Sequence, residues 1–139
     1  MKRACSLVAA VGFVFTILAC SSGGKYGEAK TVLEKQVAGM ETFVTALEKA
    51  GSSAEVAAAF TGYAETMKVL APQMKALAEK YPDLKNEKEP PAELKPLMDQ
   101  IQAISQRMAP ATMKAAQYMM DPAVQEAQRK FMEAAASFK

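Results

Sequence analysis

The sequence predicts an all-α protein, an antiparallel helical bundle of four helices in which the last helix is short. Alanine, glutamate, lysine, glutamine and methionine dominate the chain after residue 25, and all five are good helix formers. Apolar residues recur there at alternating intervals of four and three, which is the period of one buried helix face. The strict alternation of strands and the Asn-Gly or Asp-Gly turns of hairpins do not occur.

The first helix is predicted over residues 26–50. Gly51 follows it as a residue suited to the left-handed conformation that ends many helices. Ser52 and Glu55 have the spacing of a capping box, which predicts that a new helix begins directly afterwards. The apolar stripe of the first helix consists of Leu33, Val37, Met40, Val44 and Leu47.

The second helix is predicted over residues 53–81. Its stripe keeps one phase on both sides of Pro72, so we expect a kink at this proline rather than a break. Alanines every seven residues flank the stripe and should allow neighbouring helices to approach closely: Ala57, Ala64, Ala71 and Ala78. The stripe itself consists of Val56, Phe60, Tyr63, Met67, Leu70, Met74, Leu77 and Tyr81.

A charged, proline-rich stretch from Pro82 to Pro91 predicts the one long loop, lying in solvent. The third helix should begin near Pro91 or Ala92, with Pro96 in its first turn. Pro110 should bend or split this helix. Its stripe consists of Leu94, Leu97, Ile101, Ile104, Met108, Ala111, Ala115 and Tyr118.

The last helix should begin after Asp121, which suits the N-cap position, with Pro122 in the first turn. Glu126 and Lys130 are spaced for a favourable ion pair on this helix. Because it is shorter than the second and third helices, one end of the bundle should contain only three helices. Its stripe consists of Val124, Ala127, Phe131, Ala134 and Phe138.

The segment before the predicted bundle has the features of an export signal. Lys2 and Arg3 form a short positive region, and an apolar run follows over residues 7–19. A helix needs about 20 apolar residues to span a bilayer, so this run is too short for that role. Its length suits the apolar region of a secretory signal peptide.

The four residues Ile17-Leu18-Ala19-Cys20 resemble the lipobox of a bacterial prolipoprotein, and the likeness covers the first 20 residues. The resemblance implies that residues 1–19 are removed and that Cys20 becomes a lipidated N-terminus, for example with palmitate. Residues 20–25 would then be a flexible tether and residues 26–139 the bundle domain. An ordinary signal peptide cut near Ala19 and an uncleaved membrane anchor are the alternatives.

The same resemblance indicates a location in the cell envelope. In lipoproteins of two-membrane bacteria the residue after the lipidated cysteine directs sorting, and an aspartate there retains the protein. Ser21 occupies this position, which implies an outer-membrane lipoprotein facing the periplasm. The expected partners are therefore the membrane, through the lipid on Cys20, and an envelope protein.

Composition excludes several functions. Removing Lys2 and Arg3 from the 17 basic residues makes their number equal to that of the 15 acidic residues, so no basic surface for nucleic acid is expected. The two cysteines are Cys5, within the signal, and Cys20, so the exported domain has no disulfide. The absence of histidine excludes Ser-His or Cys-His nucleophiles, covalent haem attachment and the Glu-x-x-His pairs of di-iron bundles. The acidic residues lie at ordinary helix spacings, so we predict no enzyme, no catalytic residue, no cofactor and no metal site.

Methionine is the one unusually frequent residue. Its thioether is a soft ligand that suits Cu(I), but it is also an adaptable filler of apolar cores. Four methionines fall on the apolar stripes, which favours packing, and Met119-Met120 is the pair expected to be most exposed. The methionines after residue 20 are Met40, Met67, Met74, Met98, Met108, Met113, Met119, Met120 and Met132.

Two classes of function remain open. The first is a non-enzymatic envelope lipoprotein with a protein-interaction or structural role. The second is a periplasmic carrier of a small molecule or of copper that uses a methionine-lined cavity in the bundle. A cavity lined by Met67, Met74 and Met108 would favour the carrier, whereas a filled core with an exposed apolar groove would favour the interaction protein.

Overall fold

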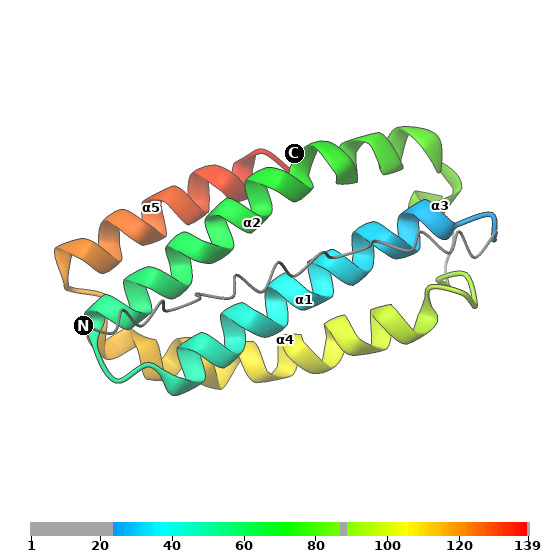
Figure 1. Ribbon diagram of the computed structural model, residues 1–139. Coiled ribbons are helices and arrows are strands. Elements are labelled where there is room, and N and C mark those ends of the chain that lie inside the picture. The colour runs from blue at the N-terminus through cyan, green and yellow to red at the C-terminus, as the bar shows by residue number, and fades with distance from the viewer. Residues whose placement is uncertain (1–23, 87–88, 139) are drawn as a thin grey trace, which may run out of the picture.

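The computed structural model describes residues 24–86 and 89–138 of the 139-residue chain, and these residues form a helical bundle (Figure 1). The predicted all-α class is confirmed, and no β-strand occurs in the described ranges. The predicted signal segment 1–19 and Cys20 lie outside the described residues. The helices are α1 (Gly27–Lys49), α2 (Ser53–Lys80), α3 (Asp83–Asn86), α4 (Lys95–Ala115) and α5 (Pro122–Ala136), with a 3-10 turn, η1 (Ala116–Tyr118), between the last two.

Local side-chain caps explain where α2 and α5 begin. The Ser52 hydroxyl accepts a hydrogen bond from Glu55 N–H at 3.3 Å, which confirms the predicted capping box. Asp121 accepts from Ala123 N–H at 2.9 Å and so caps α5 as predicted. Gly51 follows the C-cap residue Ala50 directly, as predicted, but no described glycine has a positive φ, so α1 ends through an extended Ala50 without a left-handed glycine.

The prolines inside helices do not interrupt them. α2 continues through Pro72, and α4 continues through Pro110 to Ala115, so Pro110 does not split the third long helix. Each proline removes one backbone donor, but burial of the flanking apolar face holds the helix together. Ala111, directly after Pro110, is among the buried residues of α4.

The loop between α2 and α4 is more structured than predicted. It contains the short helix α3, and Leu84 of α3 packs against the apolar core instead of lying in solvent. α4 begins at Lys95, a few residues later than expected, because Leu94 N–H donates to the Pro91 carbonyl at 2.8 Å and closes a separate turn there. Pro96 lies in the first turn of α4, as predicted.

The long helices alternate in direction along the chain, but their neighbours in space follow a different order (Figure 1). α1 packs against α2 and α4, and α5 packs against α2, which gives the spatial order α5, α2, α1, α4. The α1–α4 and α2–α5 pairs are parallel in Figure 1. For α1 and α4 the contacts agree, since Arg107 of α4 pairs with Glu41 while Lys114, one heptad later, donates to the Glu48 carbonyl. The connection carrying α3 therefore crosses the end of the bundle.

The core is divided into two clusters along the bundle axis. At one end, here called the four-helix end, side chains of all four long helices pack together, and at the other, the three-helix end, α5 does not contribute. α5 ends beside the middle of α2, as Figure 1 shows. Buried residues of the four-helix end include Phe43, Val44, Leu47, Val56, Phe60, Ile104 and Val124; those of the three-helix end are Tyr26, Ala29, Val32, Leu70, Leu77 and Leu94.

The predicted stripes describe these cores well, but they include one exposed residue and omit several buried ones. Phe138 lies beyond α5 and is 37% exposed, so it does not belong to the core. Phe43 and Val32 are buried although the predicted stripe of the first helix omits them. Both lie beside stripe positions, and the helix buries a wider face because it contacts two neighbours, α2 and α4.

Candidate functional site

A surface groove lies between α1 and α2, with a volume of about 610 Å³. All its lining residues belong to α1, to α2 or to Ala50 at the end of α1, so neither α4 nor α5 contributes to it. Small side chains make up its walls, notably Ala38, Gly39, Thr42, Ala58, Gly62 and Thr66. Both threonine hydroxyls donate to backbone carbonyls of their own helices, at 2.8 Å for Thr42 and 3.0 Å for Thr66. The groove surface is consequently largely apolar.

Two aromatic side chains line the inner side of the groove. The rings of Phe43 and Tyr63 stack with centroids 4.8 Å apart, one from α1 and one from α2. Phe131 of α5 lies behind them, with its ring centroid 5.9 Å from that of Tyr63. Burial raises the pKa of the Tyr63 hydroxyl, so the ring stays neutral. These contacts connect the groove directly to the core of the four-helix end.

The two glycines of the groove differ in their surroundings. A Cβ atom at Gly39 would lie 2.7 Å from Cγ2 of Thr66, so a glycine is needed for the close approach of α1 and α2 at that point. A Cβ atom at Gly62 would meet no atom of the described residues within 4 Å. Glycine is unfavourable in a helix interior, and no contact of the described chain requires it at position 62.

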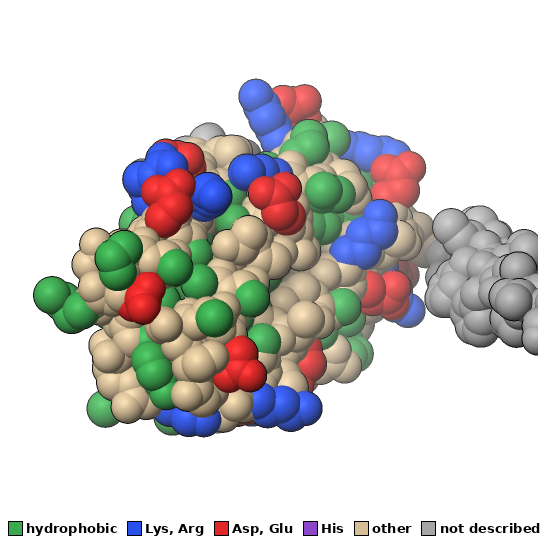
Figure 2. All heavy atoms as spheres, turned by 60° about the vertical axis from the view of Figure 1, so that its left-hand side comes forward, with side chains coloured by type: hydrophobic (Ala, Val, Ile, Leu, Met, Phe, Trp, Pro, Cys, Tyr) green, Lys and Arg blue, Asp and Glu red, His purple; other side chains and the backbone are tan. Residues whose placement is uncertain are grey.

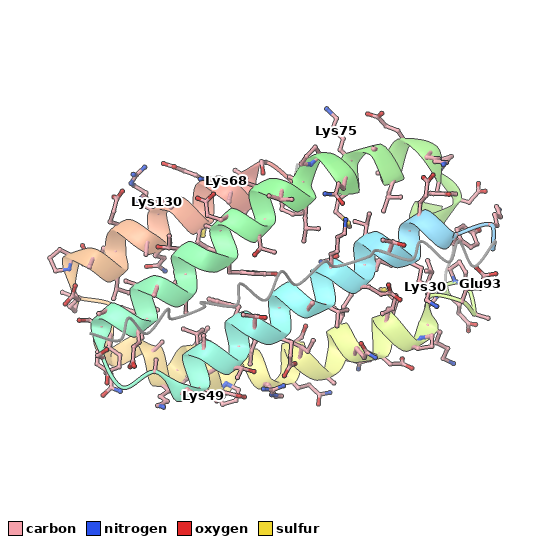
Figure 3. The ribbon with its side chains drawn as sticks, viewed as in Figure 1. Lys30, Lys49, Lys68, Lys75, Glu93 and Lys130 are labelled. Carbon is pink, nitrogen blue, oxygen red and sulfur yellow. The ribbon has the colours of Figure 1, made fainter. Side chains whose placement is uncertain are left out.

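The charged groups along the groove are mainly basic. Lys35 and Lys49 of α1 line it at opposite ends, and neither forms a salt bridge with any described residue. Lys49 stands at the C-terminal end of α1 in Figure 3. The single carboxylate, Glu55, accepts hydrogen bonds from Gly51 N–H, at 2.8 Å, and from the Ser52 hydroxyl. The bond from Gly51 lowers the pKa of Glu55 most.

An ion-pair cluster on the far side of α1 holds α4 in place. Arg107 donates to both carboxylate oxygens of Glu48, at 3.0 and 2.7 Å, and to Glu41 at 2.6 Å. These hydrogen bonds lower the pKa of Glu48 below its ordinary value. The sequence did not predict this cluster, because charged residues this far apart in the chain carry no signal that α1 and α4 are neighbours. The cluster faces solvent, and its charge-assisted hydrogen bonds connect α1 to α4.

The methionines do not gather around one cavity. Met108 packs against the core of the four-helix end, and Met74 packs against the core of the three-helix end. Met67 is half-buried and belongs to neither cluster. The three thioethers proposed for a carrier site are therefore distributed along the bundle, which agrees with a packing role.

Other methionines lie on the surface. Met120 is 84% exposed, as predicted, whereas Met119 is half-buried and packs against the core. Met113 and Met132 are also exposed, at 78% and 60%. Figure 2, turned toward the four-helix end, shows hydrophobic side chains interspersed with charged ones rather than one continuous apolar face.

The chain enters the fold at the three-helix end. Tyr26 is buried there, with its ring centroid 5.5 Å from that of Tyr81 at the end of α2. Lys25 pairs with Asp83 of α3 at 3.5 Å. The predicted lipidation residue, Cys20, precedes Tyr26 by six residues and lies outside the described ranges.

Within residues 24–86 and 89–138, no cluster of three or more cysteine, aspartate or glutamate side chains is arranged to hold a metal ion. None of the helices in the same ranges combines the length and the apolar character needed to cross a membrane.

No protein-family model, no curated protein sequence and no solved structure matches this chain.

Proposed function

We propose that this chain is a bacterial envelope lipoprotein that is anchored through Cys20 and acts by binding a partner protein, without enzymatic activity. The observation that carries the anchor is the sequence Leu18-Ala19-Cys20 at the end of an apolar run led by Lys2 and Arg3. The observation that supports a binding role is the apolar groove between α1 and α2, which lies on the surface of a bundle in which Met74 and Met108 pack against the core.

The fold gives the proposed anchor a geometric consequence. The six-residue step from Cys20 to Tyr26 spans at most about 20 Å even when fully extended. α2 contains 28 residues and is therefore about 42 Å long. A lipid on Cys20 would hold the three-helix end next to the membrane and present the four-helix end, with the groove, to the periplasm. The protein would most simply reside in the outer membrane, because Ser21 is not the retaining aspartate.

Metabolic labelling with a radioactive fatty acid tests the anchor. The full-length protein should incorporate the label and remain with the membrane fraction, because several acyl chains bind far more firmly than one. Cys20→Ser should lose the label and accumulate as the unprocessed precursor. Cys5→Ser is the matched control, since Cys5 lies within the predicted signal, and it should be labelled like the parent chain. Equal labelling of Cys20→Ser and the parent would contradict the proposal.

Crosslinking in intact envelopes tests the partner role. A photoreactive residue at Ala58, an exposed position that lines the groove, should form a discrete adduct with another protein. The same residue at Ala109, an exposed position of α4, should not. Adducts of equal yield at both positions would argue against a specific binding surface.

A further inference from the structure

We propose that the groove between α1 and α2 binds an amphipathic, acidic α-helix of a partner protein. This inference rests on the proposed binding function and names the chemistry of its partner. Three features of the groove carry it: its shape, the open space at Gly62 and the two lysines at its ends.

The shape of the groove fits a helix. Two helices form its walls and stacked aromatic rings line its inner side, and helical partners commonly lay an apolar face into grooves of this kind. The wall side chains are small, and the hydroxyls of Thr42 and Thr66 are used internally, so a docked backbone could approach closely. Alanines or leucines on the partner would then contact Ala58 and the rings of Phe43 and Tyr63.

Gly62 provides an observation independent of the groove's composition. The close approach of α1 and α2 explains the glycine at position 39, but no described residue lies within 4 Å of a Cβ atom at position 62 to explain the glycine there. A glycine in an exposed helix interior destabilises the helix, and no contact within the described chain compensates for that loss. A partner helix that contacts the α2 backbone at this point accounts for it.

The charges select an acidic partner. Lys35 and Lys49 are 14 positions apart on α1, which is about 21 Å along the helix. Lys35 donates to the neutral side chain of Gln73 at 3.2 Å, and Lys49 has no salt bridge among the described residues. Glu55 is held in the capping box and offers little to a basic ligand. Carboxylates near both ends of a docked helix would pair with the two lysines, whereas lysines there would be repelled.

A peptide-binding measurement tests the proposal. The probe is a fluorescein-labelled synthetic helix of about 18 residues, with leucine and alanine on one face and glutamates spaced like the two lysines. A second peptide carries lysines in place of the glutamates. The full-length protein is held in phosphatidylcholine nanodiscs, with empty nanodiscs as the blank, and binding is followed by fluorescence anisotropy.

The acidic peptide should bind saturably and at least about tenfold more tightly than the basic peptide. The double variant Lys35→Glu/Lys49→Glu should reverse this preference, and both positions are on the surface, so its fold should persist. Gly62→Leu fills the groove and should weaken binding at least about tenfold, while Gly62→Ala should unfold at a higher temperature. Ala109→Leu, on α4, is the control for an added apolar side chain and should bind like the parent.

Several results would overturn the inference. These are equal binding of the two peptides, no saturable binding of the acidic one, or unchanged affinity in Gly62→Leu when circular dichroism shows that this variant is folded. Self-association of the parent chain that Gly62→Leu abolishes would assign the groove to a second copy instead. The outcome is separable from that of the anchor, because anisotropy reports on the groove whether or not Cys20 carries a lipid.

Discussion

The two ends of the bundle are built from similar helices but differ in how completely their apolar faces are covered. At the four-helix end, Phe43, Phe60 and Phe131 come from three helices, and their ring centroids lie 5.3 to 6.1 Å apart. At the three-helix end, α5 is absent, and Leu84 of the α3 segment covers part of the same face. The difference shows that one continuous stripe along α2 serves two cores of unequal depth.

This inequality predicts unequal local stability. Backbone amide hydrogens exchange with solvent fastest where few buried apolar contacts stabilise a helix. We expect the last turns of α2 to exchange faster than its first turns. The proposed anchor would then be attached to the less stable three-helix end, and the proposed binding groove would lie at the more stable four-helix end.

The largest expected effect comes from placing a charge in the smaller core. Leu70 is 2% exposed, and Leu70→Asp would bury a carboxylate without a partner. We expect a loss of more than about 3 kcal/mol in the free energy of unfolding, measured by urea denaturation of the chain from Ser21 onward. Val69→Asp is the matched control: Val69 is 63% exposed, so its replacement should cost less than about 0.5 kcal/mol. Equal stability of the two variants would refute the assignment of Leu70 to a core.

Truncating one side chain at each end compares the cores directly. Phe60→Ala removes a ring from the aromatic cluster and should cost about 4 kcal/mol. Leu77→Ala, at the three-helix end, should cost about 2 kcal/mol, because Leu77 retains some contact with water. Urea denaturation of both variants measures the difference. A larger loss for Leu77→Ala would reverse the proposed order of the two ends.

Gln36 lies where the two cores meet. It stands on the buried face of α1 between Val32 and Met40, which belong to different clusters, and its side-chain oxygen is buried without a hydrogen-bond partner among the described residues. Gln36→Met keeps the shape and removes the unpaired group, so it should stabilise the fold by about 1–3 kcal/mol. Thermal unfolding would measure the change in stability, and amide hydrogen exchange would compare the two ends of α2. Destabilisation, or an unchanged difference in exchange between the two ends of α2, would show that Gln36 does not separate the cores.

Acid should act mainly on the four-helix end and produce the smallest effect. Hydrogen bonds lower the pKa of Glu48, paired with Arg107, of Glu55, in the α2 cap, and of Asp121, in the α5 cap. A lowered pKa in the folded state gives stability that is present above the ordinary pKa and is lost as pH falls through the folded value.

As the pH falls from about 6 to about 3, the difference in amide exchange rate between the two ends of α2 should therefore become smaller. Glu48→Gln should show a weaker dependence on acid than the parent, because the variant cannot lose the charge at position 48. The same acid dependence in both chains would show that the pair with Arg107 contributes no pH-dependent stability.

Short-range patterns were sufficient to predict most of the fold. The capping box at Ser52 and Glu55 and the N-cap at Asp121 act within one helical turn, so their hydrogen bonds could be inferred from spacing alone. The stripe of α2 from Val56 to Tyr81 also appears as predicted, with every position buried or half-buried. The candidate site could not be predicted in this way, because the walls of the groove are ordinary alanines, glycines and threonines on the outer faces of two helices.

The sequence by itself therefore determined the helices, their caps and the faces they bury, because these depend on contacts within a few residues. Only the tertiary structure decided which helices are neighbours. The stripes of α2, α4 and α5 are alike in period and character, so they do not specify that α4 packs on α1 and α5 on α2 in parallel. The connection through α3 and the clamp from Arg107 to Glu41 and Glu48 accompany that choice. The choice in turn leaves the α1–α2 groove uncovered.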